Sequence, residues 1–187
     1  MIKAIITDFD GTLVDTFEAN FCAYREVLGE FGIELSRDKY KACFGLRFDA
    51  FMSAVGVCDA QIYQEIKEAK TKKYPMYFDK LVPNKSLIQF LATMRTSGIK
   101  IAIASTARKE NLMNALTYIG LEDAFDLILA GVNVTKGKPD PEIYNLAMQR
   151  LGVKPEDVLI FEDSEVGFQA AEASGAKYIK VTEDCFR

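Results

Sequence analysis

Strand-like and helix-like patterns alternate along most of this chain of 187 residues. Over its second half, short apolar runs of strand length are separated by segments whose apolar residues repeat at helical spacing. The segment 85–96 is typical, because it follows Asn84 as a candidate N-cap and stops at Gly98. Strands that alternate with helices predict a Rossmann-like α/β fold, in which helices flank a parallel sheet. The predicted strands are 2–7, 99–104, 126–130, 158–161 and 178–181, and the other predicted helices are 109–119, 141–151 and 165–174.

The region 15–83 breaks this alternation, because it is helical in pattern and contains no convincing strand. It is too long to be a single crossover connection. Asp15 and Glu18 predict a capping box at the start of its first helix. We therefore expect a small helical cap domain at 15–83, inserted after the first strand of a core made of 1–14 and 84–187. Its core stripe would be Phe17, Phe21, Tyr24, Leu28 and Phe31, and its further helices would lie near 37–44, 48–55 and 59–73.

Two aspartates, Asp8 and Asp10, directly follow the apolar run 2–7. Side chains two residues apart leave the same face of a strand, so the two carboxylates would be crowded together. Crowded carboxylates repel each other unless a cation lies between them or one of them is protonated. A hard divalent ion with oxygen ligands, most plausibly Mg²⁺, satisfies such a pair. The alternative is two surface aspartates in a strand-to-helix loop.

Polar groups also follow three later strands. In open parallel sheets, ligands bind at the carboxyl ends of the strands. Carboxylates suit a cation, whereas a lysine, hydroxyls and loop amides suit an anion, and a metal-bound phosphate uses both. Each group has a simpler explanation as a helix cap, a solvated lysine or surface charge, but all of them at matching strand ends favour a phosphate site. These residues are Ser105 and Thr106, Lys138, and Glu162 and Asp163.

Composition excludes several classes of function. The chain contains no histidine, which excludes Ser-His and Cys-His triads and histidine metal sites. A formal net charge of −4, without a Lys/Arg run, argues against a nucleic-acid partner. We see no signal-peptide pattern and no membrane-spanning apolar run, so we expect a cytoplasmic protein without a membrane partner. The scattered cysteines would be reduced, mostly buried thiols, and they are Cys22, Cys43, Cys58 and Cys185.

Four segments of the chain resemble the motifs of the haloacid dehalogenase superfamily. The segment 8–16, Asp-Phe-Asp-Gly-Thr-Leu-Val-Asp-Thr, looks like the first motif, and 103–106, Ile-Ala-Ser-Thr, is similar to the second. The segment 136–144, which contains Gly-Lys-Pro-Asp-Pro, is similar to the third, and 161–171, which begins Phe-Glu-Asp-Ser, resembles the fourth. Order and spacing also match. The last two motifs resemble the branch of β-phosphoglucomutase and phosphoglycolate-phosphatase-like enzymes, which carries a helical cap where this chain has its insertion.

The resemblance implies a role for each of these residues. Asp8 would be the nucleophile that forms an aspartyl-phosphate, and Asp10 would be the general acid and base. Asp8, the backbone carbonyl of Asp10 and Asp163 would hold Mg²⁺, with help from Glu162 directly or through water. Ser105, Lys138 and loop amides would hold the transferring phosphate oxygens. Thr106, and Asn20 in the cap, would also contact the substrate. Arg47 matches a cap position that contacts the substrate phosphate in some relatives.

One departure from the family separates the candidate functions. The mutases of this branch resemble one another in having a histidine on the first cap helix, where this chain has Asn20. We therefore expect a Mg²⁺-dependent phosphatase of a small phosphorylated metabolite, as a monomer or weak dimer. A phosphomutase is the second candidate. A catalytically silent binding protein of the same fold is the third, although the intact Asp8, Asp10, Lys138 and Asp163 argue against it.

Overall fold

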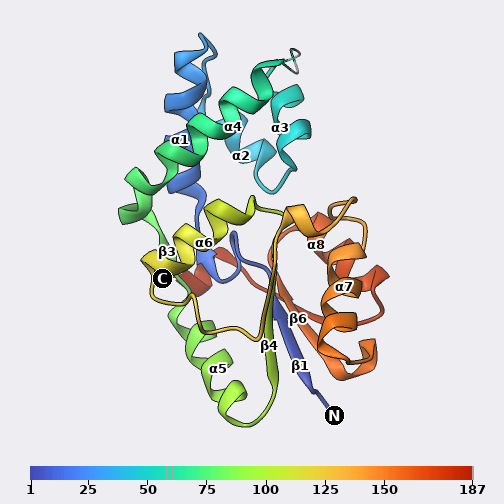
Figure 1. The fold of residues 1–187 in the computed structure, drawn as a ribbon. Helices are drawn as coiled ribbons and strands as arrows, with labels where there is room; N and C mark the ends of the chain where they lie inside the picture. Colours follow the sequence, from blue (N-terminus) through green and yellow to red (C-terminus); the bar gives the residue numbers. More distant parts are fainter. Residues whose placement is uncertain (58, 60, 187) are drawn as a thin grey trace. The chain divides into compact units, whose positions relative to one another are not determined.

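The structure is a computed structural model that describes residues 1–57, 59 and 61–186. The chain forms two compact units (Figure 1). Met1–Asp15 and Val82–Arg187 make the first, which we call the α/β unit, and Thr16–Leu81 makes the second, which we call the helical unit.

A five-stranded parallel sheet forms the centre of the α/β unit, in the order β5-β4-β1-β6-β7. The register places Ile6 of β1 between Ala102 of β4 and Ile160 of β6. The strands are nearly continuous apolar runs, as expected for strands covered on both faces. The predicted α/β fold is confirmed. The strands are β1 Ala4–Thr7, β4 Lys100–Ala104, β5 Leu127–Leu129, β6 Val158–Glu162 and β7 Lys177–Lys180.

Helices cover the two faces of this sheet. Apolar residues of α7 and α8 join one face in a buried cluster that includes Ile6 and Ile160. On the other face, Phe90 of α5 meets Phe161, with ring centroids 5.9 Å apart. The predicted N-cap is confirmed, because the Asn84 side chain accepts a hydrogen bond from the backbone N–H of Leu87 at 3.1 Å. The helices are α5 Lys85–Thr96, α6 Lys109–Tyr118, α7 Glu142–Leu151 and α8 Glu165–Ala173, with short 3₁₀ helices at Gly131–Asn133, Pro155–Asp157 and Glu183–Phe186.

A short antiparallel pair was not predicted. β2, Val14–Asp15, pairs with β3, Val82–Pro83. The sequence pattern misses it because two residues are too few to show the alternation by which strands are recognised. The pair is supported by Asn84, whose backbone N–H donates to the carbonyl of Leu13 at 2.9 Å.

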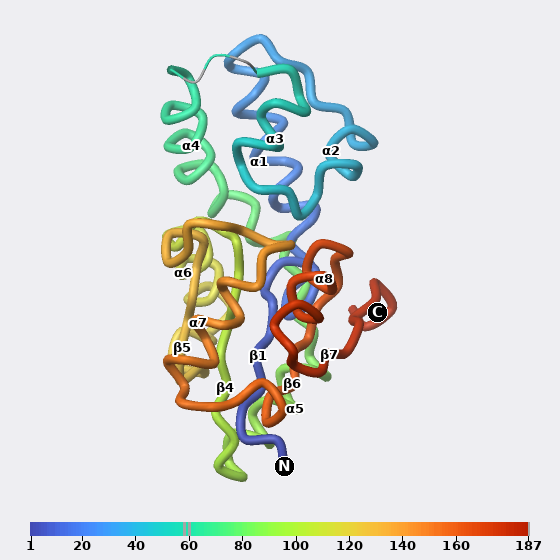
Figure 2. The backbone as a smooth tube through the Cα atoms, turned by 90° about the vertical axis from the view of Figure 1, so that its right-hand side faces the viewer, coloured from blue at the N-terminus to red at the C-terminus, as the bar shows by residue number. Residues whose placement is uncertain are grey.

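Figure 2 traces the backbone of the helical unit. Its core is rich in aromatic side chains. The predicted stripe on its first helix is confirmed as core, since Phe21 and Leu28 are buried and Phe17, Tyr24 and Phe31 pack against them. The elements are α1 Phe17–Glu30, α2 Arg37–Cys43, α3 Phe48–Ala54, α4 Gln61–Lys73 and the 3₁₀ segment η1 Tyr74–Lys80.

The predicted capping box is wrong. The N-cap of α1 is Thr16, whose side chain makes no capping hydrogen bond. Glu18 instead pairs with the guanidinium of Arg37. Asp15 belongs to the β2–β3 pair, and a residue held in that ladder does not adopt the N-cap position.

The cysteines are only partly as expected. The prediction was of mostly buried thiols, whereas Cys43 is buried, Cys22 is half-buried and Cys185 is exposed. Cys58 lies outside the described residues. Within the described ranges, none of the helices combines the length and the apolar character needed to cross a bilayer.

Candidate active site

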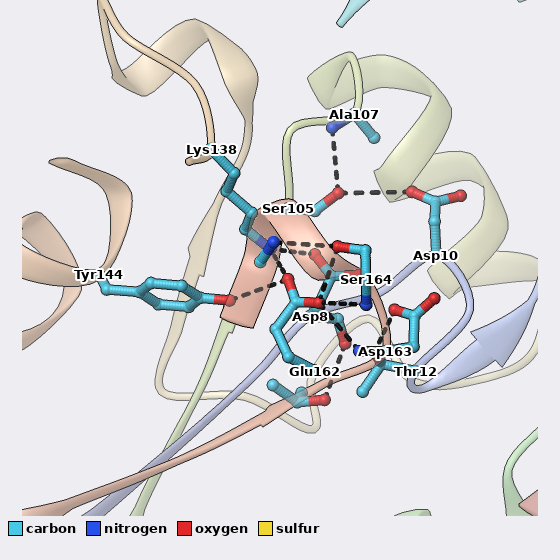
Figure 3. Close-up of polar contacts among 12 residues, drawn as sticks. Asp8, Asp10, Thr12, Ser105, Ala107, Lys138, Tyr144, Glu162, Asp163 and Ser164 are labelled. Atoms are coloured by element: carbon cyan, nitrogen blue, oxygen red, sulfur yellow. Dashed lines mark hydrogen bonds and ion pairs between the residues drawn. The ribbon is translucent and has the colours of Figure 1, made fainter. Parts of the chain in front are cut away.

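Asp8 lies just beyond the C-terminal end of β1, in the middle of the sheet (Figure 3). Its backbone N–H donates to the carbonyl of Phe161 at 2.9 Å, which extends the β1–β6 pairing by one residue. The Thr7 hydroxyl donates to the Asp8 carbonyl at 2.7 Å. The residue is 6% exposed. The ladder thus fixes the backbone from which this carboxylate projects.

Lys138 connects Asp8 to the neighbouring strand end. Its ammonium group donates to Oδ1 of Asp8 at 2.5 Å and to Oε1 of Glu162, the last residue of β6. Burial alone would lower the pKa of Lys138, but the negative charges of Asp8 and Glu162 outweigh burial and raise that pKa well above its usual range. Lys138 therefore stays charged while its side chain is only 4% exposed.

Glu162 is fully buried and accepts hydrogen bonds on both oxygens. Oε1 accepts from Lys138 and from the hydroxyl of Tyr144, the latter at 3.0 Å. Oε2 accepts from the backbone N–H groups of Asp163 and Ser164 and from the Ser164 hydroxyl. Burial would raise the pKa of this carboxyl, but Lys138 and the other donors lower it, so Glu162 is ionised at neutral pH.

Asp163 is oriented by the loop after β1. Its Oδ1 accepts from the Thr12 hydroxyl at 2.7 Å. Gly11 has φ +87° and leaves the space that the Asp163 carboxylate occupies, because a Cβ built there would lie 2.2 Å from Asp163 Oδ2. Burial raises the pKa of Asp163 to about 7, with a further increase from the charges of Glu162 and Asp10.

The remaining predicted residues of the α/β unit follow β1 and β4. The Ser105 hydroxyl donates to Oδ2 of Asp10 at a long 3.4 Å and accepts from the backbone N–H of Ala107 at 3.0 Å. Thr106 directly follows Ser105 in the chain and is half-buried. The structure therefore joins four of the predicted residues, Asp8, Lys138, Glu162 and Asp163, in one hydrogen-bonded network. Asp10 and Ser105 form a separate bonded pair (Figure 3), and the charge of Asp10 acts on both Asp8 and Asp163.

Arg47 and Asn20 belong to the helical unit. Arg47 is exposed and is the N-cap residue of α3. Asn20, on α1, is buried, and its Oδ1 accepts from the ammonium group of Lys70 at 2.7 Å. Its amide also lies 3.4 Å from the Tyr74 hydroxyl. Both residues stay predictions as substrate contacts.

Three side chains that contribute to the network were given no role in the site by sequence reasoning. Thr12, Tyr144 and Ser164 lay only within the segments that resemble the family motifs. A signal for Tyr144 was present, since it lies in the apolar stripe of α7, and a buried tyrosine needs a partner for its hydroxyl. The identity of that partner depends on three elements that are distant in the sequence.

The donor set fits a magnesium ion. Asp8 and Glu162 contact the ammonium group of Lys138, and the charge of Lys138 also acts on Asp163. Burial together with the neighbouring carboxylates raises the pKa of Asp8 as well, against the opposing charge of Lys138. Such an excess of carboxylate suits a divalent cation. Among the described residues, no group of three or more Cys, Asp or Glu side chains is arranged to hold a metal ion. Mg²⁺ does not need one, because it binds through one or two carboxylates, with water and phosphate as further ligands.

Comparison with known proteins assigns the family. The model of the haloacid dehalogenase-like hydrolases matches residues 5–181. The chain is 32% identical to a phosphorylated carbohydrates phosphatase of Thermotoga maritima, over 95% of this chain and 84% of that protein. It is 30% identical to the β-phosphoglucomutase of Bacillus subtilis, over 93% and 80% of the two chains. The crystal structure of CbbY from Rhodobacter sphaeroides in complex with phosphate aligns with a TM-score of 0.87 at 28% identity, over 100% of this chain and 89% of that one.

This chain belongs to the haloacid dehalogenase-like hydrolase family. The predicted membership is confirmed, and the phosphatases among the relatives agree with the predicted enzyme class, a phosphoric monoester hydrolase.

Proposed function

We propose that this protein is a phosphatase that hydrolyses a small phosphorylated sugar through an aspartyl-phosphate on Asp8. The observation that carries the proposal is the position of Lys138, a buried ammonium held against Asp8 at 2.5 Å in the middle of the sheet. A fixed positive charge beside a carboxylate allows an anionic phosphate to approach an anionic nucleophile. The family assignment and the phosphatase from Thermotoga maritima support the same chemistry.

In the first step, a carboxylate oxygen of Asp8 bonds to phosphorus and the bond from phosphorus to the sugar oxygen breaks. Asp10 donates its proton to that leaving oxygen, so the sugar departs as an alcohol. Ser105, 3.4 Å from Asp10 Oδ2, orients this acid. Lys138 retains its charge throughout and stabilises the negative charge that develops on the transferring oxygens.

In the second step, water attacks the phosphorus of the aspartyl-phosphate. Asp10, now ionised, accepts a proton from that water, and the bond between phosphorus and the Asp8 oxygen breaks. Inorganic phosphate leaves, and both aspartates return to their starting protonation states. One residue can act first as acid and then as base because the second step requires the reverse proton transfer.

Asp8, the backbone carbonyl of Asp10 and Asp163 would hold Mg²⁺, which when bound neutralises phosphate charge. Thr12 fixes the Asp163 carboxylate for this purpose. Glu162 was also predicted to help hold the metal directly or through water. Its five hydrogen-bond donors favour an indirect role, in which it positions Lys138 and the loop that carries Asp163.

Thr106, Arg47 and Asn20 stay predictions as substrate contacts, with Arg47 expected to contact the substrate phosphate. A cytoplasmic location and a monomeric or weakly dimeric state stay predictions.

A phosphate-release assay over a panel of small phosphorylated sugars tests the proposal. The panel should include fructose 1-phosphate, the hexose 6-phosphates and β-glucose 1-phosphate. We expect release from at least one sugar by the wild-type protein and none by a folded Asp8→Asn protein. If the wild type releases no phosphate from any of them in Mg²⁺, the catalytically silent binding protein becomes the better reading.

A phosphomutase is the second candidate, and the similarity to the β-phosphoglucomutase of Bacillus subtilis favours it. The two are separated by incubation of β-glucose 1-phosphate with a trace of the 1,6-bisphosphate, followed by analysis of the products. A phosphatase yields mainly inorganic phosphate. Formation of the 6-phosphate isomer faster than free phosphate would identify a mutase.

A further inference from the structure

Tyr144 is the largest of the fully buried side chains and carries a polar group into an apolar cluster. It lies in the first turn of α7 and is 0% exposed, in the cluster that joins α7 and α8 to the sheet. A phenylalanine would fill almost the same space. Burial of a hydroxyl costs free energy unless the hydroxyl is hydrogen-bonded, so the extra oxygen needs a reason in its partner.

The partner is Glu162. The hydroxyl of Tyr144 donates to Oε1 at 3.0 Å, the same oxygen that accepts from Lys138 (Figure 3). A carboxylate oxygen has two lone-pair sites, and these two donors fill both of them on Oε1. Because the Tyr144 hydroxyl occupies one lone pair of Oε1, the ammonium group of Lys138 can approach this oxygen only along the other.

The other side of Glu162 is closed as well. Oε2 accepts from three donors of Asp163 and Ser164. Gly167, in the first turn of α8, lies so close that a Cβ there would be 2.0 Å from the carboxyl carbon of Glu162. The carboxylate cannot turn without breaking several hydrogen bonds, so it fixes the place of Lys138 relative to Asp8.

We infer that Tyr144 is a positioning residue, which acts through Glu162 to hold the ammonium group of Lys138 in contact with Asp8. The inference rests on the proposed function, because the consequence of correct placement is phosphoryl transfer. Without the hydroxyl, one lone-pair direction of Oε1 is free, so the ammonium group of Lys138 is no longer confined to a single direction on Glu162 and can shift away from Asp8. The nucleophile and the substrate then lose part of the positive charge that they share.

Tyr144→Phe removes a single oxygen, and Tyr178→Phe is the matched control. Tyr178 lies in the same unit, half-buried, with its ring stacked on Phe168. With p-nitrophenyl phosphate in saturating Mg²⁺, we expect Tyr144→Phe to lower kcat about tenfold, as loss of a group that orients a functional side chain does. KM should change little, the thermal midpoint should fall by only a few degrees, and the control should match the wild type. A kcat for Tyr144→Phe within about twofold of the control would overturn the inference.

A double-mutant cycle separates positioning from a general loss of packing. In a Glu162→Gln background, Tyr144→Phe should lower kcat by less than about twofold, because its effect passes through the carboxylate already lost. The same fold loss in both backgrounds would mean that Tyr144 acts only on the structure.

If the wild type shows no turnover, the proposed function fails. The coupling between Tyr144 and Lys138 can then still be tested by measuring the stability of the variants. Urea midpoints are then compared for Tyr144→Phe, Lys138→Met and the double variant. Because both side chains bond Oε1 of Glu162, the shift for the double variant should differ from the sum of the single shifts. Additive shifts would overturn the coupling of Tyr144 to Lys138.

Discussion

Among the described residues, each unit contains a lysine whose side chain is buried, and the two lysines have different surroundings. In the α/β unit, Lys138 contacts the carboxylates of Asp8 and Glu162. In the helical unit, Lys70 is 4% exposed, donates to the amide oxygen of Asn20 at 2.7 Å, and lies 3.5 Å from the ring centroid of Tyr74.

These contacts show two ways to keep an ammonium group out of water. In the α/β unit, the two carboxylates of Asp8 and Glu162 pair with the single positive charge of Lys138. The remaining negative charge is available to a metal ion. The Asn20 amide oxygen and the Tyr24 and Tyr74 rings, which contact the ammonium group of Lys70, carry no charge of their own. We interpret Lys138 as part of the reaction site and Lys70 as part of the packing of the helical unit.

The largest effect should come from the carboxylate that Lys138 contacts. Asp8→Asn keeps the volume of the side chain but removes the attacking oxygen, so kcat should fall by at least about 10³-fold. The assay is phosphate release, and circular dichroism checks that the variant is folded. Measurable turnover by folded Asp8→Asn protein would show that the buried carboxylate beside Lys138 is not the nucleophile.

Removal of divalent metal should have an effect nearly as large. The excess carboxylate around Lys138 predicts that EDTA abolishes phosphate release and that added Mg²⁺ restores it. Ca²⁺ should inhibit, because its looser and higher coordination misaligns the attack. Full activity in EDTA would show that the carboxylates around Lys138 do not hold a metal ion that the reaction needs.

Replacement of the two lysines compares the surroundings directly. Lys138→Met leaves two buried carboxylates without their partner, so kcat should fall about 10²–10³-fold and stability should drop. Lys70→Met removes a charge whose contacts with Asn20 and Tyr74 are neutral, so kcat should fall by less than about tenfold, with a smaller stability loss. Steady-state kinetics and thermal unfolding measure both. Equal losses of kcat would place Lys70 in the reaction and end the contrast.

The smallest expected effect is a pH dependence of stability in the metal-free protein. The pKa of Asp163 is raised to about 7, so the folded state binds its proton more tightly than the unfolded state. The stability that this proton contributes is present below pH 4 and is lost as pH rises through 7. Asp163→Asn should therefore raise the thermal midpoint in EDTA by about 2–4 °C at pH 8 relative to the wild type, and by less at pH 5.

Magnesium provides the control for that measurement. It should raise the midpoint of the wild type at pH 8 but not that of Asp163→Asn, because the ion needs the ionised carboxylate. A wild type that gains no stability from Mg²⁺ would contradict the assignment of Asp163 as a ligand.

Much of the fold could be predicted because its signals are local. The helix 85–96 has a cap, a period and a stop in one stretch of sequence, and the structure agrees with all three. The β2–β3 pair could not be predicted, because a strand of two residues is too short to show an alternating pattern. The capping of α1 could not be predicted either, because Asp15 pairs with β3, which lies far away in the sequence.

The site shows the same limit. The motifs located Asp8, Lys138 and Asp163, since each directly follows or lies close to a recognisable strand end. The hydrogen bonds from Thr12 to Asp163 and from Tyr144 to Glu162 depend on the packing of separate elements. No local pattern encodes them.

Gly11 and Gly167 give the site a vulnerability that its charges do not reveal. A methyl group at either position would overlap the carboxylate of Asp163 or of Glu162. A natural variant with alanine at one of them would retain every acid and base of the site and the same net charge, yet its carboxylates would be displaced. Whether a relative of this protein is active therefore cannot be judged from its charged residues alone. The residues at the positions of Gly11 and Gly167 must be compared as well.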